Sequence, residues 1–194
     1  MAIQPELWHA LLPVIDVFAS LAVRYCVGGS VASSFTGVAR ATLDVDLVAE
    51  LKAAHAAPFT AALEHDYYVD LEMVQEAIRN HRSFNLIHLA TMFKVDVFIM
   101  EPSVFARENM RRRIGLEVPE IQRVLYFTSP EDIVLHKLLW YAMGDGVSDR
   151  QWYDLQGVLR LQTTRLDLVY MHGWANQLGL SALLHRALDE AGLS

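Results

Sequence analysis

The sequence predicts an α+β protein, because segments typical of strands and of helices alternate up to residue 128 and only helical segments follow. The chain of 194 residues is long enough for one compact domain, or for one domain with an appended helical lobe. We therefore expect an α/β core over residues 1–128 and a C-terminal helical lobe over residues 129–194.

The elements of the core follow from the spacing of their apolar residues. Steps of three and four between Leu7 and Ala22 predict an N-terminal helix that is interrupted or restarted at Pro13. Alternating or continuous apolar residues predict the strands, and a short connection near residues 90–91 predicts an antiparallel pair. The expected strands cover residues 24–27, 43–48, 84–89, 93–100 and 123–127. The expected helices of the core cover residues 7–22, 30–37, 53–65 and 72–79.

The C-terminal lobe begins with a recognisable helix start. Ser129 suits the N-cap, Pro130 suits the first helical position, and Asp132 places an acid at the third. The helices expected from this point cover residues 129–143, 149–161, 165–178 and 180–191.

Composition and charge limit the possible functions. With 53% hydrophobic and 20% charged residues, the chain has enough apolar material for a sizeable core, which excludes global disorder. Its formal net charge of -7 argues against tight binding to extended DNA, which needs concentrated Lys and Arg. A local basic patch is still possible, and its candidates are Arg107, Arg111, Arg112 and Arg113.

The single cysteine and the N-terminal residues indicate where in the cell the protein is expected. Cys26 excludes an internal disulfide and lies in an apolar stretch, where we expect a buried and inert thiol. The N-terminus shows neither the basic segment nor the small-residue cleavage site of a signal peptide, and no run of 18 apolar residues predicts a membrane span. These features predict a cytoplasmic protein of bacterial type with no membrane partner.

The strand over residues 43–48 carries two carboxylates one residue apart. Asp44 and Asp46 therefore project from the same face of the strand, opposite Val45 and Leu47. Magnesium prefers oxygen ligands and is commonly held by one or two carboxylates together with substrate phosphates. Asp-x-Asp is a short motif, and a strand edge that faces solvent explains it equally well.

A third aspartate strengthens the hypothesis of a metal site. Asp96 lies between Val95 and Val97, and a carboxylate in so apolar a strand must be paired, solvated or bound to metal. If its strand lies beside the strand of Asp44, three carboxylates converge. Such a cluster can hold two cations about 3.5–4 Å apart. Asp96 is also a candidate general base, which would take a proton from an acceptor.

A glycine turn precedes the carboxylates. Gly28 and Gly29 lack a β-carbon, so that a phosphate can approach the backbone, and Ser30 would start the following helix, whose N-terminus favours an anion. A side chain at Gly29 is therefore expected to reduce triphosphate binding more than stability. A tight strand–helix turn without any ligand explains the two glycines as well.

Three further polar residues are candidates for nucleotide contacts. Arg40 would steady the triphosphate, although a solvated loop cation is an equal alternative, and Thr42 is a weaker candidate. Lys137 lies in the first C-terminal helix among leucines, where it would reach a phosphate or extend to the surface as an ordinary lysine. The chain contains no zinc-ligand spacing, P-loop, Rossmann turn or nucleophile elbow.

The residues Gly28-Gly29-Ser30, Asp44-x-Asp46 and Asp96 resemble the core motif of the polymerase-beta-like nucleotidyltransferase superfamily. This resemblance covers roughly residues 20–160 and implies a mixed sheet flanked by helices. It also implies that a nucleoside triphosphate such as ATP binds together with Mg²⁺ (or Mn²⁺), and that its NMP is transferred to a hydroxyl. The roles that it implies are metal ligation by Asp44, Asp46 and Asp96, phosphate contacts by Gly28 and Ser30, and a contact from the helical lobe by Lys137.

A second motif resembles a narrower group. The run Ser129-Pro130-Glu131-Asp132, then Lys137, then residues 149–155, is similar to the bacterial branch related to toxin components of abortive-infection systems. In that branch a Lys-Asp pair usually opens the second helix, whereas here Ser148 precedes Asp149, which leaves the roles of Asp149 and Asp154 open.

Three functions are compatible with these residues. The first is an active nucleotidyltransferase whose hydroxyl acceptor is a tRNA end, a protein or a small molecule, and the net charge favours a protein or a small cationic acceptor over RNA. The second is a non-catalytic nucleotide-binding or protein-interaction module with the same fold. The third is a toxin that acts with a separate antitoxin partner.

Overall fold

The computed structural model describes residues 5–37, 44–144 and 149–193, and the side chains of residues 149 and 150 lie outside that description. The strands are β1 (Tyr25–Val27), β2 (Asp44–Ala49), β3 (Tyr67–Tyr68), β4 (Ser83–His88), β5 (Lys94–Ile99), β6 (Ile114–Val118) and β7 (Arg123–Phe127). The helices are α1 (Pro5–Ser20), α2 (Gly29–Thr36), α3 (Ala53–Leu63), α4 (Leu71–Asn80), α5 (Val104–Arg112), α6 (Pro130–Met143), α7 (Asp149–Leu161), α8 (Leu168–Gln177) and α9 (Ser181–Ala191), with a 3-10 turn η1 (Pro119–Ile121).

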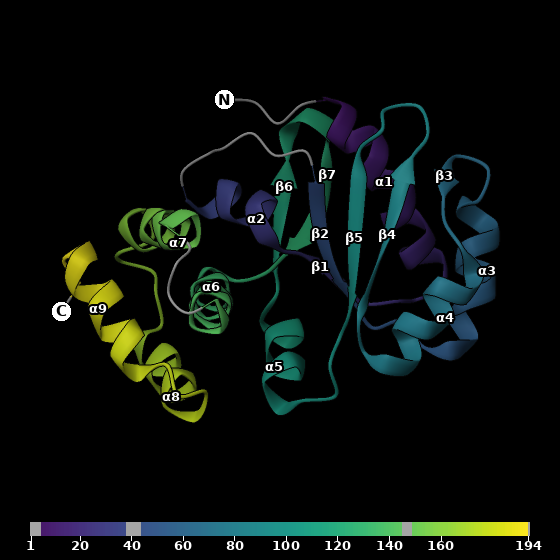
Figure 1. The fold of residues 1–194 in the computed structure, drawn as a ribbon. Coiled ribbons are helices and arrows are strands. Elements are labelled where there is room, and N and C mark those ends of the chain that lie inside the picture. The colour runs from purple at the N-terminus through teal and green to yellow at the C-terminus, as the bar shows by residue number, and fades with distance from the viewer. Residues whose placement is uncertain (1–4, 38–43, 145–148, 194) are drawn as a thin grey trace. The chain divides into compact units, whose positions relative to one another are not determined.

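Within the described residues, the strands form one seven-stranded sheet in the order β3-β4-β5-β2-β1-β7-β6 (Figure 1). The pairs β2–β5 and β1–β7 are parallel, and the pairs β1–β2, β3–β4, β4–β5 and β6–β7 are antiparallel. The predicted α+β class with a mixed sheet is therefore confirmed, as is the antiparallel pairing of the two strands on either side of residues 90–91.

The chain divides into two compact units, one made of the described residues of Met1–Gly29 and Ala41–Phe127, the other of those of Ser30–Arg40 and Thr128–Ser194. The first unit contains the sheet and most of the helices that precede residue 128. The second contains α6 to α9 together with α2, which is the only helix from the first half of the described chain in that unit.

The core of the first unit lies between one face of the sheet and helices α1, α3 and α4. Phe59 of α3 stacks on Phe18 of α1 with ring centroids 5.4 Å apart and meets Phe84 of β4 edge-on at 5.8 Å. Val45 and Leu47 of β2 are fully buried, and each such apolar side chain contributes about 1.5–3 kcal/mol.

The same alternation fixes the register of β2. A shift by one residue would place Asp44 and Asp46 in the apolar layer and expose Val45 and Leu47. Apolar burial therefore determines which face of the sheet carries the carboxylates.

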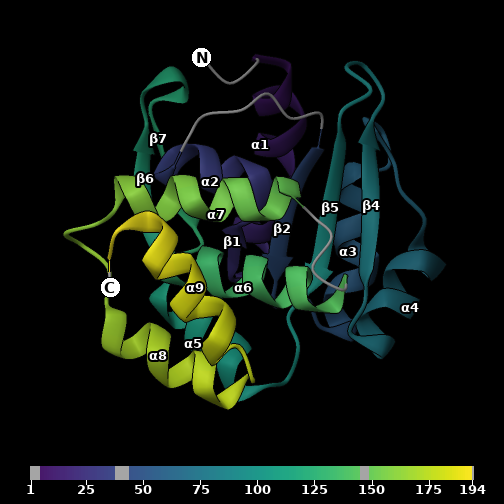
Figure 2. The ribbon, with the colours of Figure 1, turned by 60° about the vertical axis from the view of Figure 1, so that its left-hand side comes forward.

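The second unit is a helical assembly with its own core (Figure 2). Its buried apolar side chains come from every helix of the unit, and they include Val31, Val134, Leu138, Leu155, Val158, Met171 and Leu184. The C-terminal end of α2 is linked to the segment that follows α7, because the side-chain amide of Gln162 donates to the main-chain oxygen of Thr36 at 2.9 Å. Gly37 follows at the same place, and a β-carbon there would lie 3.0 Å from Val158.

The interruption expected at Pro13 is wrong, because α1 runs without a break from Pro5 to Ser20. Proline removes one main-chain donor from the helix. The buried stripe that includes Leu11, Val14 and Phe18 holds the helix against the sheet on both sides of that gap. None of the helices in the described part of the chain is long and apolar enough to span a membrane.

Candidate active site

Parallel pairing of β2 with β5 brings the three predicted aspartates to one patch of the sheet. In the register of this pair, Asp46 lies opposite Asp96 and Asp44 lies opposite Lys94. Both strands alternate half-buried and buried residues in phase, so that these four side chains share the face opposite the apolar core. We call Asp44, Asp46, Lys94 and Asp96 the acidic square.

Lys94 is the member of the square that the sequence analysis missed. Its ammonium lies 2.7 Å from Oδ2 of Asp96, with 43% of the lysine side chain and 18% of the aspartate side chain exposed. The hydrogen bond to Asp96 raises the pKa of Lys94, and the charges of Asp96, Asp44 and Asp46 raise it further. The signal was present in the sequence, because residues two apart in a strand share a face.

The glycine turn, Gly28 and Gly29, contacts Asp46 directly. The main-chain N–H of Gly28 donates to the main-chain oxygen of Asp46 at 2.8 Å. Gly29 has φ +54, and a β-carbon at that residue would lie 1.7 Å from Oδ2 of Asp46. Glycine is therefore required at position 29 by its backbone conformation and by the carboxylate of Asp46.

Of the other nucleotide contacts predicted near the turn, the structure describes Ser30 alone. Ser30 is half-buried in the first turn of α2, and its main-chain oxygen accepts from the hydroxyl of Ser34 at 2.9 Å. Helix α2 begins at Gly29, one residue before the predicted start. Arg40 and Thr42 lie outside the described residues.

Lys137 forms a buried ion pair in the second unit. Its ammonium donates to Oδ2 of Asp154 at 3.0 Å and to Oε1 of Gln151 at 3.1 Å. The side chains of Lys137 and Asp154 are only 8% and 9% exposed. The alternative of an ordinary surface lysine is therefore wrong, and the ion pair gives Lys137 a structural role between α6 and α7. Its contact with a nucleotide stays a prediction.

Replacing Lys137 by methionine should lower the free energy of unfolding by about 3–5 kcal/mol, because the nearly buried carboxylate of Asp154 would lose its cation. Urea unfolding measures this loss. The double variant Lys137→Met, Asp154→Leu should regain most of it, and the exposed Lys52→Met serves as a control. A loss below about 1 kcal/mol would contradict the prediction. A double variant that regains stability without regaining NTP affinity would add support for a phosphate contact.

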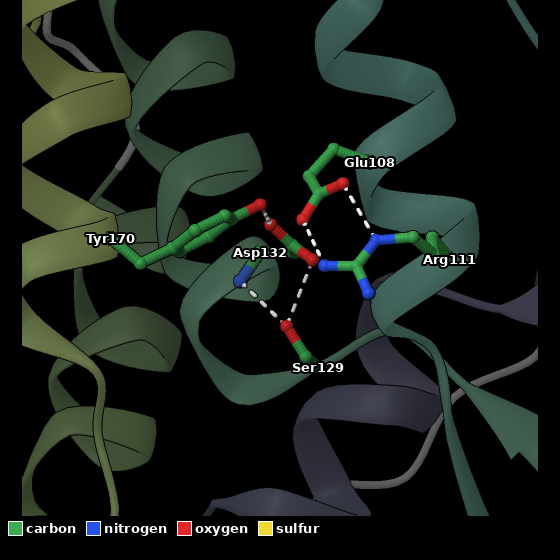
Figure 3. A network of polar contacts seen from close by, with 5 residues as sticks. All are labelled: Glu108, Arg111, Ser129, Asp132 and Tyr170. Atoms are coloured by element: carbon green, nitrogen blue, oxygen red, sulfur yellow. Dashed lines mark hydrogen bonds and ion pairs between the residues drawn. The ribbon is translucent and has the colours of Figure 1, made fainter.

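The first turn of α6 is held by a capping network (Figure 3). The hydroxyl of Ser129 accepts from the main-chain N–H of Asp132 at 3.2 Å and donates to Oδ2 of Asp132 at 2.9 Å. The phenol of Tyr170 donates to Oδ1 of Asp132 at 2.6 Å, and Glu131 accepts from the main-chain N–H of Asp167 at 3.0 Å. This part of the motif thus has a structural explanation, in which Asp132 links α6 to α8.

The arginines proposed as a basic patch make local contacts around α5. Arg111 forms an ion pair with Glu108 at 2.6 Å, which Figure 3 also draws, and the guanidinium of Arg107 donates to the main-chain oxygen of Pro102 at 3.1 Å. The guanidinium of Arg113 lies 4.6 Å from the ring centroid of Tyr126. These contacts explain several of the arginines without a nucleic-acid partner.

In the part of the chain that the structure describes, no three side chains of His, Cys, Asp or Glu are grouped to hold a metal ion. The three aspartates lie in one patch of the sheet, because Asp46 is opposite Asp96 in the pairing of β2 with β5. The carboxylate of Asp96 forms an ion pair with Lys94. Asp44 and Asp46 lie on one strand and share one face of it.

No family model matches the chain, and no curated protein matches its sequence. Its fold matches an antigenic nucleotidyltransferase-like protein from Paracoccidioides brasiliensis with a TM-score of 0.54, 16% identity and coverage of 96% of this chain and 94% of that one. It also matches the antibiotic-resistance factor ANT(2'')-Ia, with a TM-score of 0.55, 14% identity, and coverage of 95% and 98%. A candidate nucleotidyltransferase from Thermotoga maritima gives a TM-score of 0.53, 14% identity, and coverage of 79% and 96%. At these identities the likeness establishes the fold, which is that of the nucleotidyltransferases.

Proposed function

We propose that the chain is a nucleotidyltransferase that moves an NMP from a metal-bound NTP to a hydroxyl acceptor. The observation that carries this proposal is the close fit of the glycine turn to the carboxylate strand. Gly28 donates to the main chain of Asp46, and Gly29 leaves the space that the carboxylate of Asp46 occupies. A backbone turn able to approach phosphates and a carboxylate able to hold a cation are thereby fixed side by side.

The residues present suit one divalent cation. Two carboxylates on one strand face, completed by phosphate oxygens and water, match the oxygen ligands that Mg²⁺ prefers, and Mn²⁺ accepts the same donors. Asp44 and Asp46 are the residues that would hold it, and Gly29 keeps the approach to Asp46 free of a side chain. When bound, the cation would neutralise charge on the phosphates.

The chain's own groups account for the rest of the reaction. The N–H groups and small residues of the turn, Gly28 to Ser30, would position the triphosphate. The acceptor oxygen would form a bond to the α-phosphorus while the bond from that phosphorus to the bridging oxygen breaks and pyrophosphate leaves. Asp96 would take the proton of the acceptor hydroxyl. Lys137 and the undescribed residues Arg40 and Thr42 remain candidate nucleotide contacts.

Labelled nucleotides test this proposal directly. Each of the four NTPs would be supplied with Mg²⁺ and with the RNA, protein or small-molecule fraction of a cell lysate, labelled at either the α- or the γ-phosphate. We expect the α-label to enter one fraction and the γ-label to appear as pyrophosphate. The variant Asp96→Asn should lower the rate of transfer at least a hundredfold, because a positioned base contributes roughly 10²–10⁴-fold.

Each other outcome of this experiment favours a different function. Binding of an NTP without any transfer supports a nucleotide-binding module, and release of the γ-label as free phosphate contradicts nucleotidyl transfer. The narrower resemblance to toxins would be supported if expression of the wild type halted the growth of the host cells while expression of Asp46→Asn did not. The net charge of -7 favours a protein or a small cationic acceptor over tRNA.

A further inference from the structure

The two edges of the sheet differ in how far they are protected from pairing with another strand. An unpaired strand edge presents main-chain donors and acceptors, and natural sheets blunt such edges with short strands, lysine or proline. The edge strand β3 has two residues, whereas β6 at the opposite edge has five and contains neither lysine nor proline. Within the described residues, β6 pairs with β7 alone. One long edge of the sheet is therefore suited to a further strand.

The side chains of β6 are also incompletely covered. Ile114 and Leu116 lie on the face of the sheet that carries the apolar core, because Leu116 is opposite the fully buried Leu125 of β7. Both are nevertheless only half-buried. On the other face, Gly115 and Glu117 are exposed. A strand beside β6 would extend the apolar layer past Ile114 and Leu116 and remove more of their surface from water.

Opposite charges lie on either side of Gly115. The guanidinium of Arg113 lies 4.6 Å from the ring centroid of Tyr126, and Tyr126 is opposite Gly115 in the register of β6 and β7. Arg113 therefore shares the face of Gly115 and Glu117. Four residues of a strand span about 13 Å, so that Arg113 and Glu117 of one chain do not reach each other. Glu117 forms no hydrogen bond or ion pair within the described residues.

We propose that β6 is a dimerisation edge, to which a second copy of this chain adds its own β6 in antiparallel pairing. With Gly115 opposite the same glycine of the second copy, Glu117 lies directly opposite Arg113 of the other chain, and this ion pair forms twice. The same register places Ile114 opposite Leu116 twice on the apolar face. The pairing occupies both β6 edges and closes at two copies. It concerns a different surface from the proposed catalytic site.

A second copy suits this edge because the arrangement is its own complement. An arginine and a glutamate lie at equal distances from a central glycine, so that a two-fold axis at the glycine brings each charge to its opposite. A strand of unrelated sequence would match these charges only by chance. An edge of five residues is a small interface, and we therefore expect half of the chains to dimerise at about 10–100 µM.

Sedimentation velocity of the full chain between about 1 and 300 µM tests this inference. The wild type should change from monomer to dimer over this range. Glu117→Arg and Arg113→Glu each place like charges opposite each other twice, and each should weaken dimerisation roughly tenfold. An equimolar mixture of the two variants restores both ion pairs and should dimerise as the wild type does. The control is Glu120→Arg, which reverses an exposed charge in η1, beyond the strand, and should have no effect.

A disulfide tests the register without changing the charges. Gly115→Cys places two thiols opposite each other at the two-fold axis, where a Cα–Cα distance of about 4.5–5.5 Å permits a disulfide. Its β-carbon would lie 3.2 Å from Cγ1 of Val124, a contact that a small shift of this side chain relieves. Under mild oxidation, Gly115→Cys should form a covalent dimer at least about tenfold faster than Glu120→Cys. The native Cys26 is buried and does not compete.

The outcomes decide for or against the inference. A wild type that stays monomeric up to about 300 µM overturns it, as does equal dimerisation of the wild type and Glu117→Arg. A mixture of the two folded charge variants that stays monomeric overturns it as well. If Arg113→Glu does not fold, Glu117→Arg and the disulfide decide, and cross-linking no faster than in Glu120→Cys overturns the register. Growth into species larger than dimers contradicts a pairing that closes at two copies.

Discussion

Replacing Asp46 by asparagine should lower the affinity for magnesium–NTP by roughly a hundredfold and abolish transfer while the protein stays folded. Asparagine keeps the shape of the side chain and removes its charge. The hydrogen bond from the N–H of Gly28 goes to the main chain of Asp46, so that the substitution leaves it intact. Calorimetry of magnesium–NTP binding and a thermal melt measure the two effects separately.

The control for Asp46→Asn is Asp66→Asn, which removes the same charge from a side chain of the first unit that is 68% exposed. This variant should bind nucleotide as the wild type does. Equal affinities in the two variants would show that the charge of Asp46 contributes nothing to binding. A large fall in the melting temperature of Asp46→Asn would instead give the carboxylate a structural role.

Replacing Gly29 by alanine should lower the free energy of unfolding by about 2–4 kcal/mol. Part of this cost is the backbone conformation, because an L-residue in the left-handed region costs roughly 1–2 kcal/mol. The rest comes from the β-carbon, which would lie 1.7 Å from Oδ2 of Asp46 and force the carboxylate aside. The expectation from sequence, that binding suffers more than stability at this residue, thus underestimates the loss of stability.

A double-mutant cycle separates the two costs of Gly29→Ala. Adding Asp46→Ala removes the two nearest atoms, so that the closest remaining one is the β-carbon of residue 46, at 3.0 Å. The double variant should recover the steric part and retain the backbone part. Gly173→Ala is the matched control, because a β-carbon there meets nothing within 4 Å and α8 favours alanine over glycine. If Gly29→Ala proves as harmless as Gly173→Ala in urea unfolding, the close fit to Asp46 is wrong.

Local patterns predicted much of the fold, because the alternation of β2 and β5 and the cap at Ser129 are properties of short segments. Helix α5 was missed because its sequence is dominated by charged side chains, with a narrow buried face formed by Phe105, Asn109 and Met110. Such a helix is stabilised by tertiary packing, which a single segment does not reveal. Strand β6, which follows it, alternates half-buried and exposed residues from Ile114 to Glu117 and ends on the buried Val118, so that its sequence does carry the pattern of a strand.

The candidate site could be predicted only in part for a similar reason. The placement of Asp44 and Asp46 on one face follows from the spacing of two residues in a strand. The opposition of Asp46 and Asp96 depends on the parallel pairing of strands 50 residues apart, and no local rule sets that register. The same spacing places Lys94 on the face of Asp96, but the ion pair between them is a contact of two side chains, which the spacing alone does not specify.

The hydrogen bond between Gln162 and Thr36 joins residues 126 positions apart, and this separation affects how the protein folds during its synthesis. At roughly 5–20 residues per second, a ribosome needs about 6–25 s to make the chain between them. Over that interval α2, whose Val31 and Ala32 are buried in the folded protein, lacks part of its own unit. Nascent chains halted before residue 149 should therefore bind holdase chaperones through this segment, and no single cut can release the helical unit as one continuous fragment.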